Sequence, residues 1–252
     1  MIYLRSLITN ICFFFIMMLG CTITLFVGPI SRKGTVYLWD RIVMPTVFWF
    51  VRNIAGLKLE YRGLENILKK PALYACKHES ALETYAFTQP VPTCTYVLKK
   101  ELVYMPFFGW TQYFYGMVPV DRKGGAKAMK NMLKGVSKIV KKNRPVVVFP
   151  EGTRCKPGTT KGYKSGFLFL AENLDLDVVP VAVNTGLFWA KNSFLRYPGT
   201  AVIEFLPPIK VQKHQDKKVF MDNLEQVIEA KCKELNDEAV KKYPWVKKNL
   251  GA

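Results

Sequence analysis

The chain has 252 residues and little of three things on which common enzyme sites depend: histidine, paired cysteine and acidic side chains. Only His78 and His214 are present, so a zinc or haem site built mainly from histidine is not supported. Six scattered cysteines form no Cys-x-x-Cys pair, which argues against a disulfide framework and fits a reducing cytosolic setting. Neither a Gly-x-Ser-x-Gly elbow nor a nucleotide-binding P-loop occurs, so those hydrolase classes are unsupported as well.

Acidic residues are outnumbered, with 19 Asp and Glu against 37 Lys and Arg, and the formal net charge is +18. Such a charge favours anionic partners: phosphorylated small molecules, anionic lipid surfaces or nucleic acid. No nucleic-acid-reading module is recognisable, so we expect no nucleic acid partner. Half of the residues are apolar, which suffices for a substantial α/β core.

Charge is also missing from the N-terminal segment, where no residue between Arg5 and Arg32 is charged. Residues 11–27 are nearly all apolar, and as a helix they are long enough to cross the hydrocarbon core of a bilayer. A cleavable signal peptide would need a shorter apolar stretch. A lipoprotein cleavage site at residues 19–21 is an alternative with an incomplete small-residue pattern. We therefore expect a transmembrane or membrane-associated helix.

Positive charge after this segment, at Arg32, Lys33 and Arg41, exceeds the single Arg5 before it. By the positive-inside rule, the rest of the chain is expected to face the cytoplasm. A second apolar run, residues 42–51, is too short to span easily and is expected to be buried or interfacial.

From residue 57 onward, short apolar runs alternate with amphipathic stretches. This alternation predicts a mostly parallel central sheet flanked by helices, so that residues 1–56 form a membrane anchor and residues 57–252 an α/β domain. The aromatic residues 105–110 are expected to form a loop. Strands are expected at residues 57–61, 72–76, 94–98, 117–120, 146–149, 178–183 and 201–205, and helices at 80–87, 125–142, 162–173 and 217–235.

His78 follows one expected strand directly and can serve as a general base, because the ordinary pKa of histidine is close to neutrality. Glu83 could orient its ring, as the carboxylate does in serine-hydrolase triads. Five residues turn about 140° around a helix, so the two side chains meet only if His78 precedes a helix and Glu83 lies in its first turn. Alternatively, Ser80 and Glu83 form a capping box, in which Glu83 bonds back to the backbone.

A second polar turn, Glu151, Gly152, Thr153 and Arg154, follows the expected strand 146–149. Glycine allows the backbone to approach a ligand closely, while threonine and arginine supply a hydroxyl and a planar cation for oxyanions. An ordinary strand-to-helix turn is the alternative.

Four motifs then resemble those of glycerolipid acyltransferases, closest to the bacterial 1-acyl-sn-glycerol-3-phosphate acyltransferases, over residues 57–205. In chain order they are His78-x4-Glu83, Gly116-Met-Val-Pro-Val-Asp-Arg122, Phe149-Pro-Glu-Gly-Thr-Arg154 and Val178-Val-Pro-Val-Ala-Val183. One departure is Glu83, which stands where the family usually has aspartate.

This resemblance implies O-acylation of lysophosphatidic acid at its sn-2 hydroxyl, with acyl-coenzyme A or acyl-carrier protein as donor, no cofactor and no metal. His78 would be the catalytic base and Glu83 its orienting partner. Substrate binding, chiefly of the acceptor phosphate, would fall to Arg122, Glu151, Gly152, Thr153 and Arg154. The resemblance also implies that the protein is located at the cytoplasmic membrane of a bacterium.

Two alternatives stay open at this point. The first keeps the chemistry and changes the acceptor to another lysophospholipid or glycerol 3-phosphate. The second is a non-catalytic, basic, membrane-anchored binding protein, which gives no reason for these residues to follow successive strands.

Overall fold

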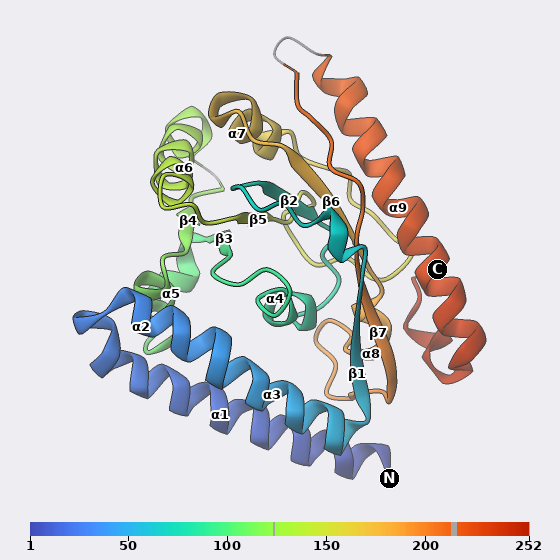
Figure 1. The fold of residues 1–252 in the computed structure, drawn as a ribbon. Helices are drawn as coiled ribbons and strands as arrows, with labels where there is room; N and C mark the ends of the chain where they lie inside the picture. Colours follow the sequence, from blue (N-terminus) through green and yellow to red (C-terminus); the bar gives the residue numbers. More distant parts are fainter. Residues whose placement is uncertain (123, 213–215, 252) are drawn as a thin grey trace.

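The computed structural model describes residues 1–122, 124–212 and 216–251, and His214 lies outside them. Its centre is a seven-stranded sheet in the order β1-β7-β6-β2-β5-β3-β4 (Figure 1). Neighbouring strands are parallel except β6 and β7, which confirms the predicted, mostly parallel sheet. The strands are β1 (Leu57–Arg62), β2 (Leu73–Cys76), β3 (Thr95–Lys99), β4 (Val118–Val120), β5 (Val146–Val148), β6 (Val178–Val183) and β7 (Gly199–Phe205).

Helices cover both faces of this sheet, which is why its strands are apolar on both sides. Successive residues of β2 point to opposite faces: Leu73 and Ala75 pack with helices α6, α7 and α9, whereas Tyr74 and Cys76 pack with α4. All four predicted helices are present. The helices of this part are α4 (Leu82–Ala86), α5 (Phe108–Tyr115), α6 (Gly125–Val140), α7 (Gly166–Leu174), α8 (Thr185–Phe188) and α9 (Lys217–Lys242).

The loop predicted at residues 105–110 is confirmed for residues 105–107 and wrong for residues 108–110, because α5 begins at Phe108. Nothing in its sequence signals a helix start, since Phe107 at the N-cap makes no side-chain hydrogen bond. Packing against the N-terminal helix stabilises it instead. A Cβ on Gly28 would lie 2.5 Å from the Phe114 ring, so only glycine permits this close approach.

The N-terminal residues form two helices side by side, called here the helical hairpin (residues 2–55). The first is α1 (Ile2–Ile30), the only helix in the described part that is long and apolar enough to cross a membrane by length and composition. The second runs without a break through α2 (Arg32–Tyr37), a π-helical turn, α3 (Met44–Phe50) and another π-helical turn, up to Gly56. The segment 42–51, predicted as buried or interfacial, is therefore part of a longer helix.

One face of α1 is fixed to the rest of the chain along its whole length. Asn10 Nδ2 donates to the carbonyl of Phe194 at 2.9 Å, and the backbone N–H of Arg196 donates to Ser6 Oγ at 2.9 Å. The opposite face exposes large apolar side chains, including Phe14 and Phe15. The buried positions recur every three or four residues: Ser6, Thr9, Asn10, Phe13, Met17, Gly20, Cys21, Thr24 and Gly28.

Hairpin residues also enter a common core with the sheet, because Met44 and Val47 pack in one cluster with Leu82 and Ala201. The chain turns from the hairpin into β1 at Gly56, whose φ of 71° glycine adopts without strain. The division into an anchor and a domain after residue 56 stays a prediction. The hairpin is thus built into the molecule.

Candidate active site

The carboxyl ends of three parallel strands bring the predicted site residues together. His78 follows β2, the turn from Glu151 to Arg154 follows the neighbouring β5, and Arg122 follows the edge strand β4. Arg122 reaches back across β3, and its guanidinium donates to the carbonyl of Gly152. Ligands collect at this edge of α/β sheets, and the sequence places its polar residues there.

His78 Nδ1 and Glu83 Oε1 are 2.8 Å apart, because His78 precedes α4 and Glu83 lies in its first turn. The same oxygen accepts from the backbone N–H of Ser80 at 2.8 Å and of Glu79 at 2.9 Å. The contact with histidine and the backbone bond of a capping box therefore exist together. Glu83 Oε2 accepts from the hydroxyl of Thr185 at 2.6 Å, so the hydroxyl and both backbone groups donate to this carboxylate.

Because the carboxylate only accepts, Nδ1 carries a proton and Nε2 has a free lone pair. The imidazole is stacked on the Phe149 ring, with centroids 3.9 Å apart and planes 19° apart, and the Tyr96 ring lies nearly parallel to Phe149 with centroids 5.9 Å apart. Stacking and the bond to Glu83 together fix the plane of the His78 ring. Its side chain is 17 % exposed and lines a cavity.

Glu151 lines neither of the two cavities described below, and its role in binding the acceptor stays a prediction. Its carboxylate is buried, accepts from Lys77 Nζ at 2.8 Å and accepts from the backbone N–H of His78 at 3.0 Å. Lys77 also donates to Glu229 of α9 at 2.7 Å. Burial alone would lower the pKa of Lys77, but the two carboxylates raise it, so the ammonium is retained. This cluster contains one ammonium and two carboxylates, so it offers an anionic ligand no unpaired positive charge.

Glu79 directly follows His78 in the sequence and is fully buried. One of its oxygens accepts from the backbone N–H of Gly186 at 3.0 Å. Burial, together with the nearby carboxylate of Glu83, raises the pKa of Glu79 well above its usual range. This environment therefore favours the neutral acid over the carboxylate.

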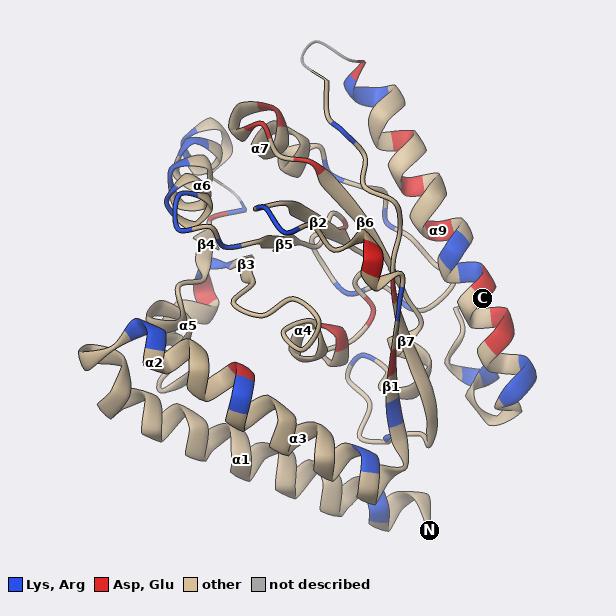
Figure 2. Cartoon of the chain, in the orientation of Figure 1, with Lys and Arg blue, Asp and Glu red and all other residues tan. Residues whose placement is uncertain are grey.

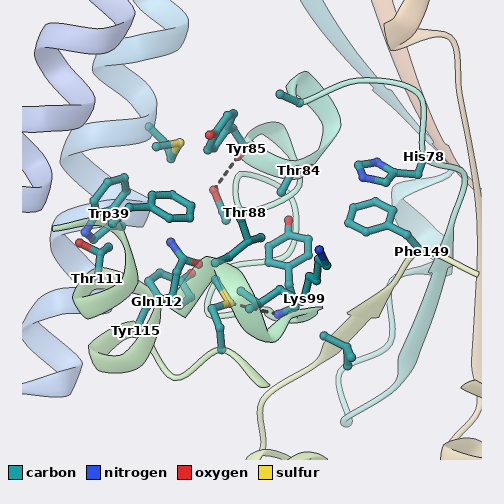
Figure 3. A pocket seen from close by; sticks show the side chains of 18 of the residues that line it. Trp39, His78, Thr84, Tyr85, Thr88, Lys99, Thr111, Gln112, Tyr115 and Phe149 are labelled. Carbon is teal, nitrogen blue, oxygen red and sulfur yellow. Dashed lines mark hydrogen bonds between the residues drawn. The ribbon is translucent and has the colours of Figure 1, made fainter. Parts of the chain in front are cut away.

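The cavity beside His78 has a volume of about 370 Å³. Met17, Trp39 and Met44 of the helical hairpin line its apolar side, whereas Arg122 and Arg154 add positive charge. Figure 3 shows His78 and Phe149 together at one end and Trp39 at the other. The cavity thus joins an apolar compartment to a base and two cations.

Gly152 and Thr153 complete the turn. Gly152 has a φ of 69°, which glycine adopts without strain, and it lines a second cavity on the other side of Phe149. Thr153 is half-buried, and its side chain lines neither cavity. The structure therefore supports Arg122, Arg154 and the Gly152 backbone as groups that a substrate can reach.

Sequence reasoning missed several residues of the site. Lys77 directly follows β2, and Thr185 is the second residue after β6. Both are polar residues at strand ends, so their positions in the sequence could have indicated that they belong to the site. No local pattern in the sequence indicates that the helical hairpin lines the cavity, because this contact depends on tertiary packing. Among the described residues, no cluster of three or more His, Cys, Asp or Glu could hold a metal ion. That the reaction needs no metal or cofactor stays a prediction.

Comparison with known proteins identifies the family. The sequence model of the acyltransferase family matches residues 58–184. A 1-acyl-sn-glycerol-3-phosphate acyltransferase of Pseudomonas aeruginosa is 35 % identical over 196 residues, covering 76 % of this chain and 75 % of that protein. The chain belongs to the acyltransferase family.

Relatives of this acyltransferase extend beyond bacteria. A 1-acyl-sn-glycerol-3-phosphate acyltransferase of Limnanthes douglasii is 29 % identical over 226 residues, covering 89 % of this chain and 75 % of that protein. The crystal structure of the 1-acyl-sn-glycerophosphate acyltransferase of Thermotoga maritima matches with a TM-score of 0.74 at 20 % identity, over 93 % of this chain and 99 % of that one. That similarity confirms the fold, including an N-terminal apolar helix. The chain is accordingly an enzyme, and the non-catalytic alternative is set aside.

Proposed function

We propose that this acyltransferase esterifies the sn-2 hydroxyl of lysophosphatidic acid and so forms phosphatidic acid. The observation that carries the proposal is the His78–Glu83 pair, 2.8 Å apart, at the end of a cavity that also contains Arg122 and Arg154. A base suits a hydroxyl, two guanidinium groups suit a phosphate, and an apolar compartment suits an acyl chain. The names of the relatives agree with this acceptor.

In the proposed reaction, Nε2 of His78 removes the proton of the acceptor hydroxyl while its oxygen attacks the thioester carbonyl carbon. A carbon–oxygen bond forms, the carbonyl oxygen becomes negative, and the carbon–sulfur bond then breaks. The imidazolium returns its proton to the leaving thiolate, so the base is restored. Glu83 stabilises the imidazolium between these steps, and no covalent acyl-enzyme is needed because the thioester is already activated.

The acceptor phosphate is assigned to Arg122 and Arg154, since Glu151 is neutralised by Lys77. Guanidinium groups bind phosphate oxygens in pairs of parallel hydrogen bonds. Another lysophospholipid or glycerol 3-phosphate would present the same phosphate, so acceptor assays must compare them directly.

We further propose how the enzyme meets its lipid. Because α1 is bonded to the domain from Ser6 onward and packed against it as far as Gly28, a helix crossing the bilayer would draw part of the domain into hydrocarbon. The hairpin instead lies along one leaflet, with its exposed apolar face in the lipid. The active site then faces the cytoplasm of a bacterial cell. Protease treatment of sealed vesicles of known orientation tests this, and cleavage from the outer surface of right-side-out vesicles would contradict it.

The test of the function is acyl transfer by the purified protein in lipid vesicles. Labelled lysophosphatidic acid, another lysophospholipid, glycerol 3-phosphate and monoacylglycerol, which has no phosphate, are each supplied with acyl-coenzyme A and with acyl-carrier protein. We expect phosphatidic acid as the main product. Efficient transfer only to an acceptor without phosphate would contradict the role of Arg122 and Arg154.

A further inference from the structure

A second cavity, with a volume of about 610 Å³, lies beside the first. Val97, Arg122 and Phe149 line both cavities, so the two meet at the ring that stacks on His78. They extend on different sides of the sheet edge. The first is bounded by α4 and the helical hairpin, and the second lies between α6 and the start of α7.

The second cavity differs in its surroundings as well as its place. Its apolar lining comes from Met129, Met132 and Phe167, and Lys164 lies at its edge beside Gly152. Helix α6 carries no acidic residue, and on Figure 2 its basic residues lie on its outer side. Its lysines are Lys127, Lys130, Lys134 and Lys138. In the described part of the chain, none of these four lysines forms an ion pair. Lys164 therefore adds positive charge at the edge of the cavity, and the lysines of α6 lie farther out on the same helix. Asp121 also lines the cavity, and its carboxylate is paired with Lys100 at 2.5 Å.

The chemistry requires a place of this kind. A thioester donor has an apolar acyl chain on one side of its reacting carbon and, on the other, a phosphopantetheine arm with amides and a terminal phosphate. When the carbonyl lies at His78, the acyl chain fits the first cavity and the arm must extend elsewhere. The second cavity begins at Phe149, has the volume of a small-molecule site and has Lys164 at its edge.

We propose that the second cavity binds the phosphopantetheine arm of the acyl donor, with Lys164 and the N-terminal lysines of α6 attracting its phosphate. The inference rests on the proposed function, because it assumes a thioester donor at His78. The arm is common to coenzyme A and the acyl carrier protein, so both donors use this site.

Filling the cavity tests the proposal. Ala128 lines it and is half-buried, whereas Ala126 lies on the same helix, is exposed and lines neither cavity. We expect Ala128→Trp to raise the donor KM about tenfold and to leave the acceptor KM unchanged, with Ala126→Trp as the matched control. Lys164→Glu should likewise raise the donor KM, while Lys161→Glu, exposed in the same loop, should not.

The binding of free coenzyme A, measured by calorimetry, tests the donor site independently of enzyme turnover. Ala128→Trp should weaken coenzyme A binding about tenfold relative to Ala126→Trp, whatever acceptor the enzyme uses. If the unsubstituted enzyme transfers no acyl chain to lysophosphatidic acid but the two variants still differ in coenzyme A binding, the proposed function is contradicted and the proposed donor site is supported. Unchanged coenzyme A binding in Ala128→Trp, a raised acceptor KM instead, or an effect on only one of the two donors would overturn the inference.

Discussion

Glu83 Oε1 accepts three hydrogen bonds, from the His78 ring and from the backbone of Glu79 and Ser80. The additional methylene of glutamate lets one oxygen serve both the helix start and the ring, while Thr185 holds the second oxygen. The departure from the usual aspartate is therefore accommodated by local geometry. The sequence predicted the contact between His78 and Glu83, but the bond to Thr185 could not be predicted because it joins positions 102 residues apart.

Substituting the charge of Glu83 tests its role. Glu83→Gln keeps the shape of the side chain but removes the negative charge that stabilises the imidazolium. We expect kcat to fall about 10²- to 10⁴-fold, by analogy with orienting carboxylates in triads. Steady-state kinetics measure this, and circular dichroism checks the fold. Full turnover in folded Glu83→Gln would show that its only role is to cap α4.

Glu79 gives a prediction of pH dependence. Its folded-state pKa is raised, so folding favours the neutral acid, and stability is lost as pH rises above the ordinary glutamate pKa. Glu79→Gln removes this loss. We expect the variant to gain thermal stability relative to the natural chain at pH 8 but not at pH 4. Melting curves at both values test it, and an equal difference at both would contradict the assignment.

At the scale of elements, the Lys77 cluster joins β2, β5 and α9. Lys77 bonds Glu151 after β5 and Glu229 on α9, and Glu151 in turn bonds the backbone of His78. The motif glutamate is thus a positioning residue that fixes the segment carrying the base. Its appearance in a recognisable turn suggested ligand binding, whereas its buried partner is 74 residues away in sequence.

Removing the cation of this cluster should be costly. Lys77→Met leaves Glu151 buried without a counter-charge, so we expect a loss of about 3–5 kcal/mol in unfolding free energy. Lys58→Met, at an exposed position of β1, is the control and should change little. Adding Glu151→Gln to Lys77→Met should recover part of the loss. Urea denaturation measures these variants and Glu151→Gln alone, and additive effects of Lys77→Met and Glu151→Gln would contradict the pairing.

The strands were predicted to within two residues at each end, because period and turn residues are local signals. Helix α5 and the continuous second helix of the hairpin were not predicted. Pro45 argues against a helix interior, yet it lies in the first turn of α3 directly after a π-helical turn. Such an arrangement depends on packing against α1, which periodicity does not report.

At the scale of the whole molecule, the basic charge and the apolar hairpin have separate places. Figure 2 shows the helices of the hairpin largely without charge, whereas α6 and α9 carry many charged residues. This arrangement suits an enzyme that draws its acceptor from lipid and its donor from water. Composition predicted anionic partners in general, whereas the acceptor and the thioester donor were implied by the resemblance to the family. The two cavities that meet at Phe149 could not be predicted from either, because they depend on the fold.

Membrane binding should depend on the exposed face of α1. Phe15 is 68 % exposed there, and a charge in its place would lie in the lipid. We expect Phe15→Glu to lower the fraction of protein that floats with vesicles, by about tenfold or more in partition coefficient. Val219→Glu, an exposed apolar position on α9, should leave flotation unchanged. Equal flotation of both variants would contradict the proposed hairpin placement.

The central claim is that His78 is the base for acyl transfer to lysophosphatidic acid. The most direct measurement is the rate of phosphatidic acid formation by His78→Ala in vesicles, at saturating donor and acceptor, with circular dichroism to show that the variant is folded. The account predicts a rate lower by at least about 10³-fold, with the donor KM nearly unchanged. A folded His78→Ala enzyme that turns over at the natural rate would contradict it.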